Sequence, residues 1–109
     1  MGRRRPRSPK ASGPTDSLHA AIVVDERDLH HLTAAEAAVQ LESFLVGWSR
    51  RRPGAVVRVI TGKGNRSQGG PVLKPLVPEL LVGRLAPVVE DYAVESGGGA
   101  YLIRVRGQR

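Results

Sequence analysis

The sequence predicts an α/β fold, a two-layer sandwich in which a mixed four-stranded sheet carries two helices, in the order β-α-β-α-β-β. Three observations predict it. The 109 residues suffice for one small domain. Short β-branched apolar runs alternate with apolar residues at helical spacing, as in β-α-β units, whose two strands run parallel. A glycine-rich turn near the end of the chain predicts a closing hairpin.

The first seventeen residues predict a disordered basic arm (1–17), ahead of a single domain over residues 18–109. The arm is rich in Arg, Pro, Ser and Gly, and it holds too little apolar surface to offset the entropy of ordering. Its five basic residues and one acidic residue supply +4 of the chain's net charge of +7. Such an arm favours contacts with phosphates, and a solvated leader is the alternative interpretation.

The stretch "LHAAIVVDE" predicts the first strand at about residues 20–27, because its centre is β-branched. Thr33 followed three residues later by Glu36 makes a capping box, which predicts a helix that starts after Thr33. The apolar stripe of this helix consists of Ala37, Ala38, Leu41, Phe44, Leu45 and Trp48. The helix should end in "SRRRPG", where arginines precede Pro53 and Gly54.

The second half of the chain predicts one helix and three strands. "AVVRVIT" reads as the second strand, and "PVVEDYAVE" and "AYLIRVR" read as the third and fourth, joined by "SGGG". The helix comes from "GGPVLKPLVPELLVGRL". Pro71 suits a first helical position, whereas Pro75 and Pro78 predict irregular first turns and a short helix.

Composition narrows the range of functions. A net charge of +7 and a pI near 11 favour a polyanionic partner such as nucleic acid, with a solubilising surface as the alternative. The chain has no cysteine, which excludes disulfides and thiolate metal sites and fits a cytoplasmic protein. It also has no apolar run long enough for a membrane helix, so we expect no membrane partner.

Polar residues follow the first two strands where each one ends. If these strands are parallel neighbours, their carboxyl ends share one sheet edge, where sites in open α/β sheets lie. Asp28, His30, Lys63 and Arg66 are then expected to converge there. Asp28 and His30 are two residues apart and point the same way from an extended backbone, while Leu29 faces the core.

The loop "TGKGNRSQGG" has the composition of an anion site. Gly62 and Gly64 let the backbone N–H groups approach a phosphate, Lys63 adds a charge, and Ser67 leads toward a helix N-terminus. It is not a nucleotide-triphosphate loop of the Walker A type, because Val57 stands where that motif needs glycine. A plain glycine-rich turn remains the alternative.

Each candidate also has a structural interpretation. His19 and His31 are expected to be structural, and Asp28 could simply cap the following helix through an Asx-type hydrogen bond. No cofactor is certain. The one that the acidic residues allow is a divalent cation, Mg²⁺ or Mn²⁺, held weakly by Asp28 with Asp25 and Glu26, which otherwise read as solvated charges.

Three blocks carry a family resemblance: "DLHHLTAAEA", "VITGKGNRSQGGPVL" and "GGGAYLIRV". In this order and spacing they resemble the Smr (small MutS-related) domain over residues 18–106. The resemblance implies a compact α/β sandwich similar to the C-terminal domain of bacterial translation initiation factor three. It also implies nucleic-acid binding and, in many members, endonuclease activity on DNA or RNA, including messenger RNA on collided ribosomes.

The resemblance also implies site residues. It assigns function to Asp28, His30, Thr61, Gly62, Lys63, Gly64, Gly97, Gly98 and Gly99. The chemistry of the loop adds Arg66 and Ser67 as phosphate contacts. Three positions depart from the family pattern: His31 replaces a usual glycine, Arg27 a usual aliphatic residue, and Ser96 the first glycine of the late glycine motif.

The sequence therefore predicts an endonuclease with little sequence specificity. His30 serves as general acid or base, Asp28 orients its imidazole, and Lys63 with the loop amides holds the phosphate. The first alternative is a binding module for nucleic acid or the ribosome that cuts nothing, and the second is an interaction protein. The choice between DNA and RNA and the oligomeric state stay open, with a monomer favoured.

Overall fold

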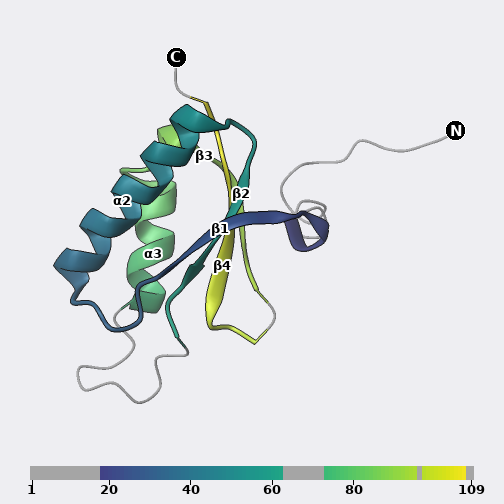
Figure 1. Ribbon diagram of the computed structural model, residues 1–109. Coiled ribbons are helices and arrows are strands. Elements are labelled where there is room, and N and C mark those ends of the chain that lie inside the picture. Colours follow the sequence, from purple (N-terminus) through teal and green to yellow (C-terminus); the bar gives the residue numbers. More distant parts are fainter. Residues whose placement is uncertain (1–17, 63–72, 96, 108–109) are drawn as a thin grey trace, which may run out of the picture.

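The computed structural model describes residues 18–62, 73–95 and 97–107. It confirms the predicted α/β class, with a mixed four-stranded sheet in the order β1-β2-β4-β3 (Figure 1). The elements are β1 (Val23–Asp28), α2 (Ala34–Arg51), β2 (Val56–Ile60), α3 (Leu73–Val82), the 3₁₀ helix η1 (Ala86–Val88), β3 (Val89–Val94) and β4 (Ala100–Val105).

The parallel pair expected from the β-α-β unit is present. β1 lies beside β2, and α2 makes the crossover between them. Asp28 pairs with Ile60, so the two strands end at the same edge of the sheet. β4 inserts between β2 and β3 and runs antiparallel to both. This order brings the turn between β3 and β4 close to the end of β2.

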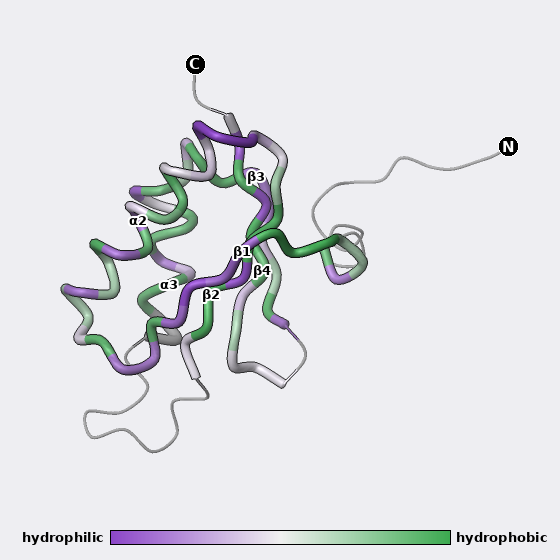
Figure 2. The backbone as a smooth tube through the Cα atoms, in the orientation of Figure 1, coloured by the Kyte–Doolittle hydropathy of each residue, from purple (hydrophilic) through white to green (hydrophobic). Residues whose placement is uncertain are grey.

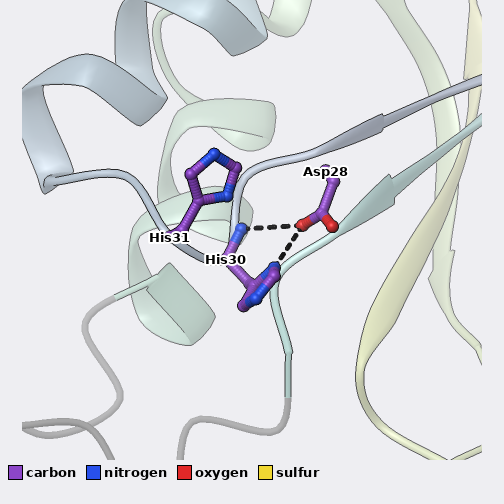
Figure 3. Close-up of side chains that lie close together, drawn as sticks. All are labelled: Asp28, His30 and His31. Atoms are coloured by element: carbon purple, nitrogen blue, oxygen red, sulfur yellow. Dashed lines mark hydrogen bonds and ion pairs between the residues drawn. The ribbon is translucent and has the colours of Figure 1, made fainter.

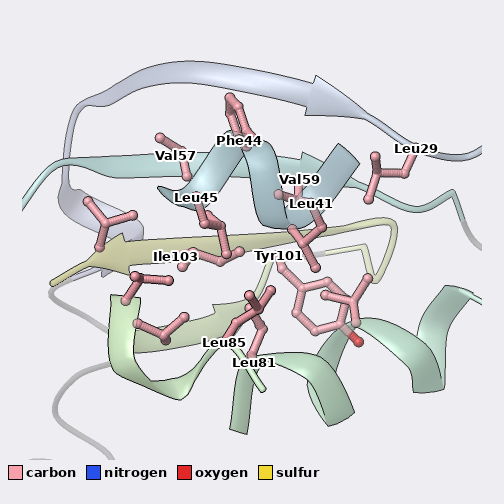
Figure 4. Close-up of a cluster of buried hydrophobic side chains, with 14 of the residues drawn as sticks. Leu29, Leu41, Phe44, Leu45, Val57, Val59, Leu81, Leu85, Tyr101 and Ile103 are labelled. Atoms are coloured by element: carbon pink, nitrogen blue, oxygen red, sulfur yellow. The ribbon is translucent and has the colours of Figure 1, made fainter. Parts of the chain in front are cut away.

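α2 begins where the capping box predicts. The Thr33 side chain accepts from the Glu36 N–H at 3.1 Å, and the Glu36 carboxylate accepts from the Thr33 N–H at 3.0 Å. Both helices cover one face of the sheet and bury a single aliphatic core against it (Figure 4). Residues of this core include Leu29, Leu41, Phe44, Leu45, Val57, Val59, Leu81, Leu85, Tyr101 and Ile103. The predicted stripe of α2 is thus core, with Ala38 and Trp48 only half-buried.

The other face of the sheet carries a small apolar cluster and a charged group. Leu18, Val56, Ala93 and Leu102 are buried together there. Beside them the Arg58 guanidinium donates to Glu95 at 2.8 and 2.9 Å and to Glu26 at 3.2 Å. Figure 2 shows that the second half of β1 is hydrophilic while β2 is mostly hydrophobic.

Two boundaries differ from the sequence prediction. Residues 18–20 form a helical turn, so β1 starts only at Val23, and the turn buries Leu18 against the open sheet face. η1 takes up the start of the predicted third strand because Pro87 lies in its first turn. α3 is short, as predicted, yet it continues through Pro78. No helix in the described part of the chain is long and apolar enough to cross a membrane.

Candidate nucleic-acid site

The candidate site begins at the C-terminal end of β1. Asp28 is the last residue of the strand, and the next N–H, that of Leu29, donates to the Ile60 carbonyl at 2.8 Å. The Leu29 side chain is 0% exposed and lies in the core, as predicted. Because Leu29 is fixed from both sides, the backbone that presents Asp28 and His30 is held by the sheet and by the core together.

Asp28 and His30 form a close pair (Figure 3). One carboxylate oxygen, Oδ1, accepts from the His30 N–H at 3.0 Å and lies 2.6 Å from the His30 ring nitrogen Nδ1. The first contact is the Asx-type bond that the sequence allowed. Asp28 does not cap α2, however, because Thr33 does. An Asx-type turn therefore accounts for the hydrogen bond from the His30 N–H to Asp28, but it does not account for the contact between Asp28 and the His30 ring.

The electrostatics of the pair favour a charged carboxylate. Partial burial pushes the pKa of Asp28 upward, but the hydrogen bonds from the His30 ring and N–H outweigh it, with help from the charges of His30 and His31. The pKa of Asp28 is therefore lowered. An ionised carboxylate can only accept a hydrogen bond, so the hydrogen lies on Nδ1 of His30. In the neutral form of the imidazole the lone pair then lies on Nε2, and 55% of the His30 side chain is exposed.

The end of β2 and the late glycine turn are joined by backbone hydrogen bonds. The N–H groups of Thr61 and Gly62 both donate to the Gly99 carbonyl, at 2.9 and 3.0 Å. The Thr61 hydroxyl donates to the Gly62 carbonyl at 3.0 Å, and its side chain is buried. Thr61 thus serves as an anchor of this corner, and Gly97 and Gly98 adopt positive φ in the adjoining turn.

Gly62 connects this corner to the Asp28–His30 pair. Its φ is +76°, a backbone conformation that L side chains rarely adopt, and a Cβ built on it would lie 3.2 Å from the His30 Cβ. A glycine therefore suits this position both for its conformation and for its closeness to His30. Three segments far apart in the sequence, at residues 28–30, 61–62 and 97–99, meet at one edge of the sheet.

The structure brings together most of the described residues that the sequence selected. Asp28 and His30 are in contact, Gly62 lies against His30, and Gly99 bonds to Thr61 and Gly62. The predicted residues Lys63, Gly64, Arg66 and Ser67 lie outside the described residues.

The family model of the Smr domain matches residues 27–106, which is most of the chain. This chain belongs to the Smr domain family. An uncharacterized protein of Treponema pallidum (strain Nichols) is 40% identical to this Smr domain over 60 residues. That match covers 55% of this chain and 29% of the relative's length, so the chain spans well under half of it. No solved structure matches, and the likeness to the C-terminal domain of translation initiation factor three therefore stays a prediction.

Membership makes this Smr domain a nucleic-acid-binding module. The net charge of +7 fits such a module, because phosphate contacts supply much of the affinity of nucleic-acid-binding proteins.

Sequence reasoning missed the surroundings of His31 in this Smr domain. His31 is exposed, and its ring meets the His30 ring edge-on, with centroids 5.3 Å apart and planes at 72°. One possible metal-ligating atom from each of Asp28, His30 and His31 lies within 4.8 Å of the others. The signal in the sequence was the second histidine of "DLHH", at a position where the family usually has glycine.

The acidic cluster considered from the sequence does not form among the described residues. Asp25 accepts from the Trp48 indole N–H at 3.0 Å, and Glu26 pairs with Arg58 at 3.2 Å. Both carboxylates are therefore bonded to other partners, away from Asp28. A cation at this edge has the two histidines as its available neighbours and lacks a set of three acids.

Proposed function

We propose that this Smr domain is an endonuclease that cleaves phosphodiester bonds of DNA or RNA with little sequence specificity. The observation that carries the proposal is the Asp28–His30 pair, whose oxygen and ring nitrogen lie 2.6 Å apart at an exposed sheet edge. A carboxylate bonded to one nitrogen of an imidazole fixes its tautomer and orientation, and so prepares the other nitrogen for proton transfer.

The cleavage step needs two proton movements. The attacking oxygen, from water or a ribose hydroxyl, loses its proton as it bonds to phosphorus, and the leaving oxygen gains a proton as its bond to phosphorus breaks. His30 performs one of these transfers through Nε2, since Nδ1 is occupied by Asp28. Asp28 stabilises the imidazolium that forms when His30 accepts a proton.

The phosphate is held by the loop after β2. In this proposal Lys63 and Arg66 supply positive charge, while Gly62, Gly64 and Ser67 supply donors to the phosphate oxygens. Two features support the assignment. Gly62, the first residue of the loop, lies so close to His30 that a Cβ added to it would be 3.2 Å from the His30 Cβ. The Gly62 N–H also donates to the Gly99 carbonyl in the turn at residues 97–99. A phosphate bound at Gly62 would therefore lie close to the imidazole.

The test is a cleavage assay on supercoiled plasmid and on structured RNA, with binding measured in parallel. We expect His30→Ala to lower the cleavage rate by about 10²–10⁴-fold while the affinity for nucleic acid changes little. The matched control is His19→Ala, because His19 contacts the Val94 carbonyl, far along the chain from this pair. A His30→Ala variant that cleaves at the wild-type rate contradicts the proposal and leaves a binding module as the better account.

The phosphate-binding part of the proposal has its own test. Lys63→Ala should weaken binding and cleavage together, because a lost phosphate contact affects both. Affinity should also fall steeply between two salt concentrations, as counterion release requires. If salt leaves the affinity unchanged, nucleic acid is not held through its phosphates, and the assignment of the loop is wrong.

A further inference from the structure

We infer that Asp28, His30 and His31 form a binding site for a divalent transition metal of the Zn²⁺ type. The three residues each offer one ligand atom, and these atoms lie within 4.8 Å of one another. No other group of three or more such residues in the described parts of the chain is close enough to hold an ion. The site goes beyond the proposed cleavage, because it uses His31, which has no part in that chemistry.

The donor set selects the metal. Two imidazoles and one carboxylate suit Zn²⁺, Co²⁺ and Ni²⁺, whereas Mg²⁺ prefers oxygen ligands and keeps most of its water. Three protein ligands with a further position open to water is the common arrangement of catalytic zinc sites. The inference therefore differs from the Mg²⁺ or Mn²⁺ that the acidic residues alone suggested, since Asp25 and Glu26 are bonded elsewhere.

The distances are within reach of coordination. In a tetrahedral zinc site with bonds of about 2.0–2.1 Å, ligand atoms lie roughly 3.4 Å apart. The Asp28–His30 pair at 2.6 Å has to separate slightly, whereas a pair at the 4.8 Å limit has to approach by roughly 1.4 Å. All three residues are exposed, so rotation of their side chains can supply both changes. Figure 3 shows the His31 ring on the opposite side of the His30 backbone from the Asp28–His30 ring contact, so His31 moves most.

The Asp28–His30 contact already holds two of the three ligands side by side. An ion replaces the hydrogen that they share, once the Asp28 Oδ1 and His30 Nδ1 atoms, which lie 2.6 Å apart, separate to roughly 3.4 Å. His31 supplies the second imidazole. His31 is available for this role, because it makes no hydrogen bond to any residue in the described segments and its only ring contact is with His30.

One consequence follows for activity, and it rests on the proposed function. A metal bound to His30 competes with its acid–base role, because it takes up the imidazole or its orienting carboxylate. We therefore expect Zn²⁺ to inhibit cleavage and a chelator to restore it. His31→Ala should need at least about tenfold more Zn²⁺ for half-inhibition, relative to its own metal-free rate.

The direct test is metal binding itself, on the untagged full chain. Titration with Zn²⁺ by calorimetry, and with Co²⁺ by visible absorption, should give one site whose affinity falls at least about tenfold in His31→Ala. His19→Ala is the matched control and should bind as the wild type does. Mg²⁺ should compete weakly or not at all.

Two outcomes overturn the inference: binding in His31→Ala equal to that of the wild type, or a Zn²⁺ dissociation constant weaker than about 1 mM in the wild type. Circular dichroism of each variant checks that the fold is kept, which the exposure of His31 favours. Failure here is distinct from failure of the proposed function. Metal binding without any cleavage leaves the site standing, and metal-independent cleavage without metal binding leaves the nuclease standing.

Discussion

Leu29 and His30 are adjacent in the sequence but differ sharply in how far their side chains are exposed to solvent. Leu29 is 0% exposed in the core beneath the helices, whereas 55% of the His30 side chain is open to solvent at the edge of the sheet. The helix-covered face and this strand-end edge thus begin one residue apart. The difference shows how a small domain assigns stability and the candidate site to different residues. The core fixes the backbone, and the edge presents exposed side chains whose loss removes little packing.

The edge keeps its shape through backbone bonds rather than through apolar burial. Leu29 donates to Ile60, and Thr61 and Gly62 donate to Gly99, so each segment of the site is held by a neighbouring strand or turn. The helix-covered face is instead one continuous aliphatic cluster. Substitutions in the core should therefore lower the stability of the fold, whereas substitutions at the edge should lower binding or cleavage.

The largest effect on stability is expected in the core. Leu41 lies on α2 and is 0% exposed, so Leu41→Ala leaves a cavity and should lower the free energy of unfolding by about 2–5 kcal/mol. Val39 is 66% exposed on the same helix, and Val39→Ala should change it by less than about 0.5 kcal/mol. Urea denaturation of both variants measures the contrast. Equal losses would mean that α2 does not anchor the core in the way its burial indicates.

The next effect joins the two regions. Gly62→Ala should cost about 1–2 kcal/mol, because alanine is strained at a φ of +76°, and its Cβ crowds His30. Gly54 offers a matched control, since its φ is +92° and a Cβ there meets nothing within 4 Å. We expect similar losses of stability from both substitutions but a fall in cleavage only for Gly62→Ala. If Gly54→Ala lowers cleavage equally, the effect comes from general destabilisation.

The sequence predicts the elements that local patterns define. Thr33 and Glu36 mark the start of α2, the periodic stripe marks its buried face, and "DLHH" and "TG" mark the strand ends that meet. Contacts that depend on the order of strands in the sheet could not be predicted from the sequence. Arg58 and Glu95 are 37 residues apart in sequence, and their pairing requires β4 to insert between β2 and β3. The same holds for Asp25 and Trp48, whose bond depends on how α2 lies across β1.

The glycine corner and His31 show two further limits. Gly62 was selected through the loop chemistry and the family pattern, and residues 97–99 through the family pattern, but the hydrogen bond from Gly62 to Gly99 appears only once the hairpin and β2 are placed side by side. His31 was expected to be structural by default, and its contact with the His30 ring appears only in the structure. Pro78 argued for a short α3, which is observed, although the helix runs through it at the loss of one backbone bond.

A smaller effect is expected at the junction between the two regions, where the site turn enters α2. Thr33→Ala removes a hydroxyl that accepts from the Glu36 N–H at 3.1 Å, and it should cost about 1 kcal/mol. Ser43→Ala removes an exposed hydroxyl from the middle of the same helix and should be neutral or slightly stabilising. Thermal denaturation compares the two variants. A loss as large in Ser43→Ala would show that the capping bond contributes nothing specific.

The smallest effect concerns the core face at high pH. Burial raises the pKa of the Tyr101 phenol, and the neighbouring Tyr92, with ring centroids 6.3 Å apart, adds to the shift. A folded pKa above the unfolded value of about 10 means that the neutral phenol stabilises the fold below that pH, and that this contribution is lost as the pH rises through the folded pKa. The free energy of unfolding should therefore decline above about pH 10 in the wild type and decline less in Tyr101→Phe. Tyr92→Phe keeps the buried phenol and should retain most of the decline. If the two variants follow the same curve, the alkaline loss arises elsewhere in the chain, and the core face does not resist ionisation as the burial of Tyr101 implies.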